Sequence, residues 1–196
     1  MLNSYAFKLS FVALGLMCFY PLSKRFFPCP QLILGAAFNW GIIMAYASLQ
    51  NSLPLNAWTL YLIAMCWTIS YDTIYALADV LDDKKLKIKS SALLFGDNVL
   101  GWISFFEILM LAGLVLIGFR INAQVEYYVI LSFCAILFIY QFIVLKKFLK
   151  EQPLNLGEGF ICMSEDTRKN RTQFFIKAFS QHHWVGMLIF LAFIVA

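Results

Sequence analysis

Charged residues are scarce in this 196-residue sequence: they make up only 13% of it, whereas hydrophobic residues make up 62%. A soluble domain is ordinarily about half apolar and about a quarter charged. The composition therefore excludes an ordinary soluble domain and predicts an integral membrane protein. A cleavable signal peptide is not expected, because Lys8 interrupts the first apolar run and no small-residue cleavage site follows it.

Cysteine is also sparse. The five cysteines are scattered along the chain and form no C-x-x-C pair, so neither a disulfide framework nor a zinc site is predicted. The sequence contains no P-loop, no G-x-G-x-x-G fingerprint and no G-x-S-x-G elbow. Phosphate chemistry in this protein would therefore have to use other groups.

Long apolar runs are abundant. A helix needs about 20 mostly apolar residues to cross a bilayer, and helices are expected because unpaired backbone groups are too costly in lipid. The runs are too long and too uniformly apolar for the alternating strands of a membrane barrel. The predicted fold is therefore all-α, a single polytopic transmembrane helix bundle over residues 1–196. Its six predicted spans are at about 5–22, 31–48, 57–78, 92–118, 125–145 and 174–196.

Basic residues gather in alternate connections between these spans, which hold thirteen of the fifteen lysines and arginines. The positive-inside rule places those connections in the cytoplasm and both termini on the opposite side. The longest of them, residues 146–173, is predicted to be a cytoplasmic loop, with helix only near its ends. Because topology accounts for the net charge of +4, membrane lipid is an expected partner and nucleic acid is not.

Acidic residues follow one face of the third predicted span. Residues three and four apart share a helix face, so Asp72, Tyr75, Asp79 and Asp83 form one stripe, with Tyr71 and Asp82 beside it. A carboxylate deep in a membrane helix costs a few kcal/mol even on the most lenient scales. Asp72 should therefore face a cavity or a partner and not lipid.

The spacing of the stripe favours a divalent cation. Like charges four residues apart repel each other on a bare helix, and Mg²⁺ commonly binds one or two carboxylates together with phosphates and water. The alternative is a solvated helix end whose acids and lysines neutralise each other. That alternative explains Asp82 to Lys85 but not the deeper Asp72. Lys24 and Arg25 are predicted on the same side of the membrane, where Lys24 suits topological anchoring and the planar fork of Arg25 suits an anionic group.

The pattern YDxxYAxxDxxDDxxxxIKSxAxxFG in residues 71–96 resembles the second aspartate-rich region of the UbiA-type intramembrane aromatic prenyltransferases. Residues 20–48, YPLSKRFFPCPQLILGAAFNWGIIMAYAS, and residues 174–192, FFIKAFSQHHWVGMLIFLA, are similar to other parts of that family. The resemblance covers nearly the whole chain outside residues 150–170. Within the family, the sequence is most similar to members that act on 4-hydroxybenzoate in ubiquinone biosynthesis.

The resemblance implies Mg²⁺-dependent transfer of a polyprenyl group from its diphosphate to an aromatic acid, at a bacterial inner membrane with the active-site loops in the cytoplasm. The implied metal ligands are Asp79, Asp83 and, beside them, Asp82. The implied substrate-binding residues are Lys89 for the diphosphate, and Arg25 with Lys24 for the acceptor carboxylate. The implied catalytic residues, which line the cavity near the acceptor, are Asp72, Tyr71 and Tyr75.

The sequence also departs from the family pattern. It lacks the first aspartate-rich region, N-D-x-x-D-x-x-x-D, and has six predicted spans where the family usually has about nine. Lys87 stands where the family commonly has glycine, and Ile43 where it has proline. We therefore expect an N-terminally incomplete domain that is inactive alone and needs an N-terminal fragment to supply the first acidic region.

The sequence is also compatible with two other functions. One is an ion-coupled transporter that uses Asp72 and Glu107, and the other is a non-catalytic fragment of a prenyltransferase. For Glu107 itself, a buried carboxylate bonded to a neighbouring helix is favoured over a ligand. For His182 and His183, an interfacial position is favoured over a metal pair, because adjacent side chains diverge on a helix.

Overall fold

A computed structural model describes residues 3–154 and 164–196, and the described part of the chain contains helices and no strand. Five stretches are long and apolar enough to cross a membrane. They are α1 (Ser4–Ser23), α2 (Pro30–Gln50), α3 (Leu55–Lys85), the run of α4 (Ser91–Phe95), η1 (Gly96–Asn98) and α5 (Val99–Ile121), and α6 (Val125–Glu151). The all-α transmembrane bundle predicted from composition is confirmed, as are five of the six spans.

The sixth predicted span, 174–196, is not one continuous helix. It begins inside α7 (Glu165–Ser180), is interrupted at Gln181 and continues as α8 (His182–Ile194). Alone, the 13 residues of α8 are about 20 Å long, which is shorter than the roughly 30 Å of a bilayer core. The helix predicted at both ends of the 146–173 connection is present, because residues 146–151 end α6 and residues 165–173 belong to α7. The middle of that loop, 155–163, lies outside the described residues.

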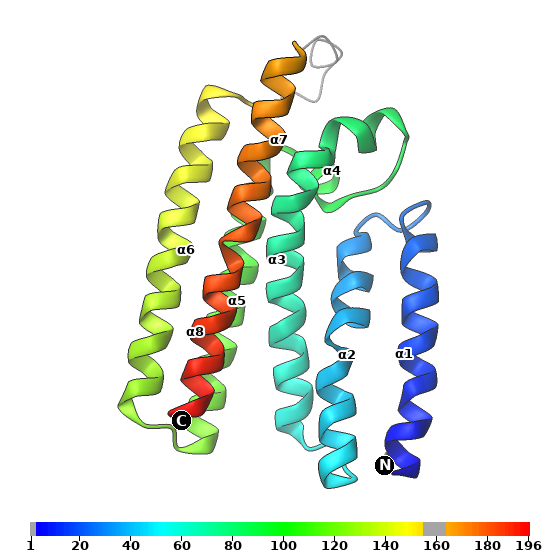
Figure 1. Ribbon diagram of the computed structural model, residues 1–196, viewed down its shortest axis with the longest axis vertical. Coiled ribbons are helices and arrows are strands. Elements are labelled where there is room, and N and C mark those ends of the chain that lie inside the picture. Colours follow the sequence, from blue (N-terminus) through cyan, green and yellow to red (C-terminus); the bar gives the residue numbers. More distant parts are fainter. Residues whose placement is uncertain (1–2, 155–163) are drawn as a thin grey trace.

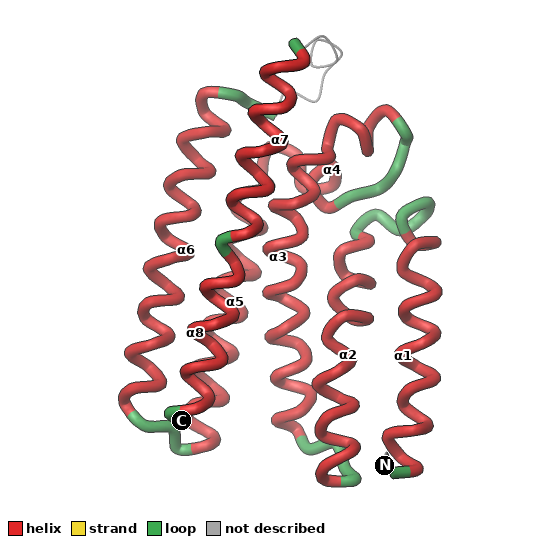
Figure 2. The backbone as a smooth tube through the Cα atoms, viewed as in Figure 1, coloured by secondary structure: helices red, strands yellow, loops and turns green. Residues whose placement is uncertain are grey.

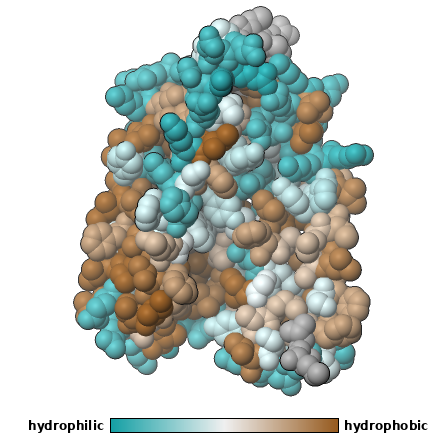
Figure 3. All heavy atoms as spheres, in the orientation of Figure 1, coloured by the Kyte–Doolittle hydropathy of each residue, from teal (hydrophilic) through white to brown (hydrophobic). Residues whose placement is uncertain are grey.

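The long helices run side by side, and both termini lie at the same end of the bundle (Figures 1 and 2). The α1–α2 turn, the connection around α4 and the start of α7 lie at the opposite end. Hydrophilic residues gather at that end and also border the opposite end, whereas hydrophobic residues are concentrated on the visible face between them (Figure 3). The predicted separation of the termini from the basic connections is confirmed. The assignment of the basic end to the cytoplasm stays a prediction.

Helix α3 is the centre of the bundle. In the most apolar stretch of α3, 50% is buried inside the protein, whereas in the most apolar stretch of α1 only 11% is buried. Small residues allow close packing against it: a Cβ added at Gly113 of α5 would lie 2.4 Å from Cγ1 of Ile63, and one at Gly35 of α2 would lie 3.4 Å from the carbonyl oxygen of Met65. The glycine in α5 therefore brings that helix into direct contact with α3.

Helix α7 packs along the charged end of α3. Arg168 forms an ion pair with Asp82, and the Thr172 hydroxyl donates to the carbonyl of Ala78 at 3.4 Å. Arg171 reaches the other neighbour, donating to the carbonyl of Gln152 at the end of α6, 3.1 Å away. Burial lowers the pKa of Arg171 to about 10, so the side chain remains a cation at neutral pH. These contacts place α7 beside the aspartate-rich end of α3.

Candidate active site

A buried polar cluster joins α2, α3 and α4 towards the end of the bundle opposite the termini. The Gln31 side-chain oxygen, at the start of α2, accepts a hydrogen bond from the Ser91 backbone at 2.9 Å, and the Ser91 and Thr73 hydroxyls are 2.8 Å apart. The Gln31 side chain also lies close enough to interact with the carboxylate of Asp72. Asp72 is therefore held by a protein partner and does not face lipid.

Three carboxylates of α3 lie on one face with a single lysine opposite them. Asp72, Asp79 and Asp83 are all half-buried, and Lys24 lies close enough to interact electrostatically with each one. The backbone fixes this arrangement, because the amide of Lys89 donates to the carbonyl of Lys24 at 2.9 Å. The α1–α2 turn and the α3–α4 connection are thereby tied together over the acidic stripe.

Asp82 lies close enough to interact electrostatically with Asp79 and Asp83, but its side chain has a partner of its own. It points to Arg168 of α7, and it lies about 100° around the helix from its neighbour Asp83. Within residues 3–154 and 164–196, no three His, Cys, Asp or Glu side chains gather in a way that could hold a metal ion. The predicted set of three metal ligands is therefore not assembled in this structure, and Asp79 and Asp83 remain as the pair that shares a face.

Tyr71 and Tyr75 lie on the neighbouring side of α3, towards α7 and α8. Both rings meet Phe179 edge to face, with centroids 5.7 and 5.3 Å away. Tyr71 also packs against Trp67 at 5.7 Å, whereas Tyr75 is 39% exposed. The predicted catalytic residues therefore divide into Asp72, which faces α2, and two tyrosines that face the break between α7 and α8.

Arg25 and Lys24 have different surroundings. Both are exposed in the turn after α1, but Lys24 is the one that interacts with the three carboxylates. Sequence reasoning had treated Lys24 mainly as a topological anchor. Two further residues of the cluster were not predicted: Gln31, which lies in the family-like stretch 20–48, and Ser91, which stands at an unspecified position of the pattern in residues 71–96.

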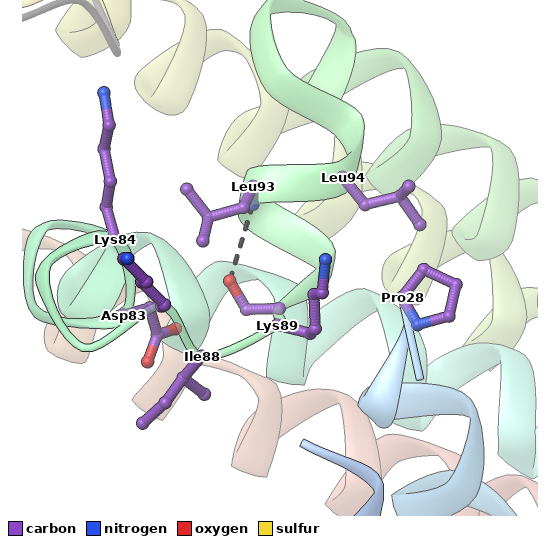
Figure 4. A pocket seen from close by; sticks show the side chains of 9 residues that line it. Pro28, Asp83, Lys84, Ile88, Lys89, Leu93 and Leu94 are labelled. Carbon is purple, nitrogen blue, oxygen red and sulfur yellow. Dashed lines mark hydrogen bonds between the residues drawn. The ribbon is translucent and has the colours of Figure 1, made fainter. Parts of the chain in front are cut away.

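A pocket of about 310 Å³ lies at the α3–α4 connection. In Figure 4, Asp83 and Lys84 lie on one side of it, and Lys89 lies on the side of Leu94 and Pro28. The hydroxyl of Ser90 accepts from the amide of Leu93 at 3.5 Å and lies close enough to interact with Asp83. The pocket therefore brings a predicted metal ligand and a predicted diphosphate-binding lysine to one cavity.

A family model described as the UbiA prenyltransferase family matches residues 1–156. The chain belongs to this family. The 4-hydroxybenzoate octaprenyltransferases of Francisella tularensis subsp. novicida (strain U112) and subsp. mediasiatica (strain FSC147) are 42% and 41% identical to it over 194 residues. The protein of the same name from Haemophilus ducreyi (strain 35000HP / ATCC 700724) is 37% identical over 194 residues.

These alignments cover 99% of this UbiA-family chain but only 61% or 62% of each relative. The chain thus spans about three fifths of the length of the curated relatives it matches. No solved structure matches it. The resemblance read from the aspartate-rich region is confirmed at the level of the family, which is a family of prenyltransferase enzymes.

Two other polar residues of the UbiA-family chain are buried away from the acidic stripe. Glu107 accepts a hydrogen bond from Ser70 of α3 at 3.0 Å, as predicted for a buried carboxylate between helices. His182 is only 5% exposed, and its Nδ1 accepts from the indole N–H of Trp67 at 3.0 Å. His182 is therefore buried against Trp67, whereas His183 is exposed, and the interfacial position of both histidines stays a prediction.

Proposed function

We propose that this UbiA-family chain forms part of a Mg²⁺-dependent enzyme that transfers a polyprenyl group from its diphosphate to an aromatic acid, 4-hydroxybenzoate. The observation that carries the proposal is that Asp83 lines one pocket with Lys89 and Ser90 and shares both its face of α3 and the influence of Lys24 with Asp79. The printed names of the relatives support the substrate classes.

The carboxylates present fit Mg²⁺. Asp79 and Asp83 share a face of α3, and two carboxylates leave room for the phosphate and water ligands that this ion usually keeps. When bound, Mg²⁺ would supply charge stabilisation for the leaving diphosphate. Asp82 is assigned a different role, because its charge is already matched by Arg168.

The lysines of the chain bind the same leaving group. Lys89 lines the pocket next to Asp83 and donates to diphosphate oxygens, which become more negative as the bond to the isoprenoid carbon breaks. Lys24 balances the charge of the acidic stripe. Arg25, in the same turn, holds the acceptor carboxylate with its planar fork.

The acceptor lies deeper, next to Asp72, with Tyr71 and Tyr75 on the neighbouring side of α3. As the donor carbon–oxygen bond breaks, its electron pair leaves with the diphosphate, and a π pair of the acceptor ring forms the new carbon–carbon bond. Asp72, held by Gln31, takes the ring proton. The aromatic rings of Tyr71, Tyr75 and Phe179 exclude water from the allylic cation.

The surroundings of the reaction follow from the bundle. Five apolar helices give the isoprenoid chain access from lipid, and the basic end, with its active-site loops, faces the cytoplasm of a bacterial inner membrane. The 196 residues contain no N-D-x-x-D pattern, and the proposal assigns the second set of acidic ligands to a segment outside them. This chain alone is therefore expected to be inactive.

An assay with Mg²⁺, octaprenyl diphosphate and 4-hydroxybenzoate tests the proposal. The purified chain should give no turnover, whereas the chain combined with a segment that carries N-D-x-x-D-x-x-x-D should prenylate the acceptor. In the combined protein, Asp79→Asn should abolish turnover and leave membrane insertion intact. Robust turnover by the chain alone would overturn the need for a second segment, and turnover at a near-normal rate after Asp79→Asn would overturn the metal assignment.

A further inference from the structure

Lys87 has an unusual backbone conformation for a lysine. Three non-glycine residues in the described ranges have positive φ, and the other two are Asn51 and Asn122; all three have φ of 53°. Asparagine visits this left-handed region readily, because its short polar side chain bonds to the local backbone. Lysine has no such compensation, so glycine would hold this position at lower energy.

The turn itself gives no reason for a lysine side chain. The Lys87 amide donates to the carbonyl of Lys84 at 3.3 Å, and the Ile88 amide donates to the carbonyl of Asp83 at 2.9 Å. These bonds end α3 and turn the chain back towards Lys89, whose amide bonds to Lys24. Every one of these contacts is made by backbone atoms, which glycine supplies equally well.

The side chain of Lys87 does line the pocket at the α3–α4 connection. Lys84, Lys89 and Asp83 line the same 310 Å³ pocket, so three lysines and one aspartate contribute to its lining. Figure 4 shows Lys84, Lys89 and Asp83 around it. The hydroxyl of Ser90 adds a polar group. This excess of hydrogen-bond donors and positive charge suits an anion with several oxygens, and phosphoryl groups are the commonest such anions that lysine binds.

We propose that Lys87 is a further substrate-binding residue, whose ammonium group binds a phosphoryl oxygen in the pocket formed with Asp83 and Lys89. The inference rests on the proposed function, since the phosphoryl group is assigned to the diphosphate of the polyprenyl donor. A phospholipid headgroup offers the same chemistry and is separated from it below. Residues held in a strained backbone conformation are typical of ligand sites, where the side chain is needed at that position.

The test uses Lys87→Gly, which should change stability and binding in opposite directions. In nanodiscs of neutral phosphatidylcholine, the melting temperature should rise by about 2–4 °C because the left-handed strain is relieved. Binding of pyrophosphate with Mg²⁺, followed by calorimetry, should weaken roughly fivefold, the effect expected from one lost ion pair in a partly exposed site. A merely structural role would lower both quantities together or leave binding unchanged.

Three further variants complete the comparison. Lys87→Arg keeps the charge and should bind pyrophosphate within about twofold of the unsubstituted chain, whereas Lys87→Asn keeps the tolerance for positive φ and should bind as weakly as Lys87→Gly. Asn51→Gly changes a residue of the same φ at the other end of the bundle and should leave binding unchanged.

The outcomes separate the inference from the proposed function. If the unsubstituted chain does not bind pyrophosphate with Mg²⁺, the inference fails, whereas the proposed function is decided by prenylation in the combined protein. If the unsubstituted chain binds and Lys87→Gly binds equally well, only the inference fails. It also fails if Lys87→Gly weakens association with anionic phosphatidylglycerol nanodiscs but not with pyrophosphate, because the pocket would then serve a lipid headgroup.

Discussion

Asp79 and Asp82 are three residues apart in the same aspartate-rich segment, and the structure predicts that their removal has very different effects. Asp79 shares a face with Asp83 and is influenced by Lys24. Asp82 instead pairs with Arg168 on α7. We therefore predict that Asp79→Asn weakens metal binding strongly, whereas Asp82→Asn weakens it little.

The magnitudes follow from the surroundings. Asp79→Asn removes one of two carboxylate ligands, and since loss of even an indirect partner of a metal commonly costs about 10–100-fold in affinity, the loss should be at least about tenfold. The Arg168 and Asp82 side chains are 38% and 53% exposed. Exposed ion pairs contribute about 0.2–1 kcal/mol to folding, so Asp82→Asn should lower the unfolding free energy by less than about 1 kcal/mol.

The assay measures Mn²⁺, a spectroscopic substitute for Mg²⁺, by electron paramagnetic resonance in the presence of pyrophosphate. Arg168→Gln is the matched control, because it breaks the same ion pair while keeping every carboxylate. Its Mn²⁺ affinity should stay within about threefold of that of the unsubstituted chain, because threefold corresponds to the free energy of one weak surface ion pair. Equal losses for Asp82→Asn and Asp79→Asn would show that Asp82 is a ligand and that this reasoning is wrong.

Two further predictions concern the packing around the site. Gly113→Ala should lower the unfolding free energy by about 1–3 kcal/mol, because the new methyl group meets Ile63, whereas Gly41→Ala, with nothing within 4 Å, should change it little; thermal unfolding in detergent compares them. Gln31→Leu removes the acceptor of the buried Ser91 amide and should cost about 1–3 kcal/mol in the same assay, and an unchanged melting temperature would contradict the polar cluster.

Local patterns were enough to predict much of this protein. Hydrophobic runs of helical length identified five spans, because the bilayer requires that length and that composition. The alternation of basic connections predicted that both termini lie at one end of the bundle. Helical periodicity placed Asp72, Asp79 and Asp83 on one face, since side-chain direction depends only on position along a regular helix.

Only the tertiary structure decided which partner each of these side chains meets. Periodicity could not tell Asp82, paired with Arg168, from Asp79, because the partner comes from a helix 86 residues away in sequence. The same holds for the selection of Lys24 over Arg25 and for the burial of His182 against Trp67.

The interruption between α7 and α8 and the left-handed turn at Lys87 were hidden for a related reason. Neither place carries a proline or glycine in this sequence, so the residues themselves gave no sign of the helix interruption or of the left-handed turn. Sequence by itself determined the helices and their polar faces, because both follow from interactions within a few residues. The neighbours that turn those faces into a candidate site depend on contacts between distant segments, which only the packed bundle specifies.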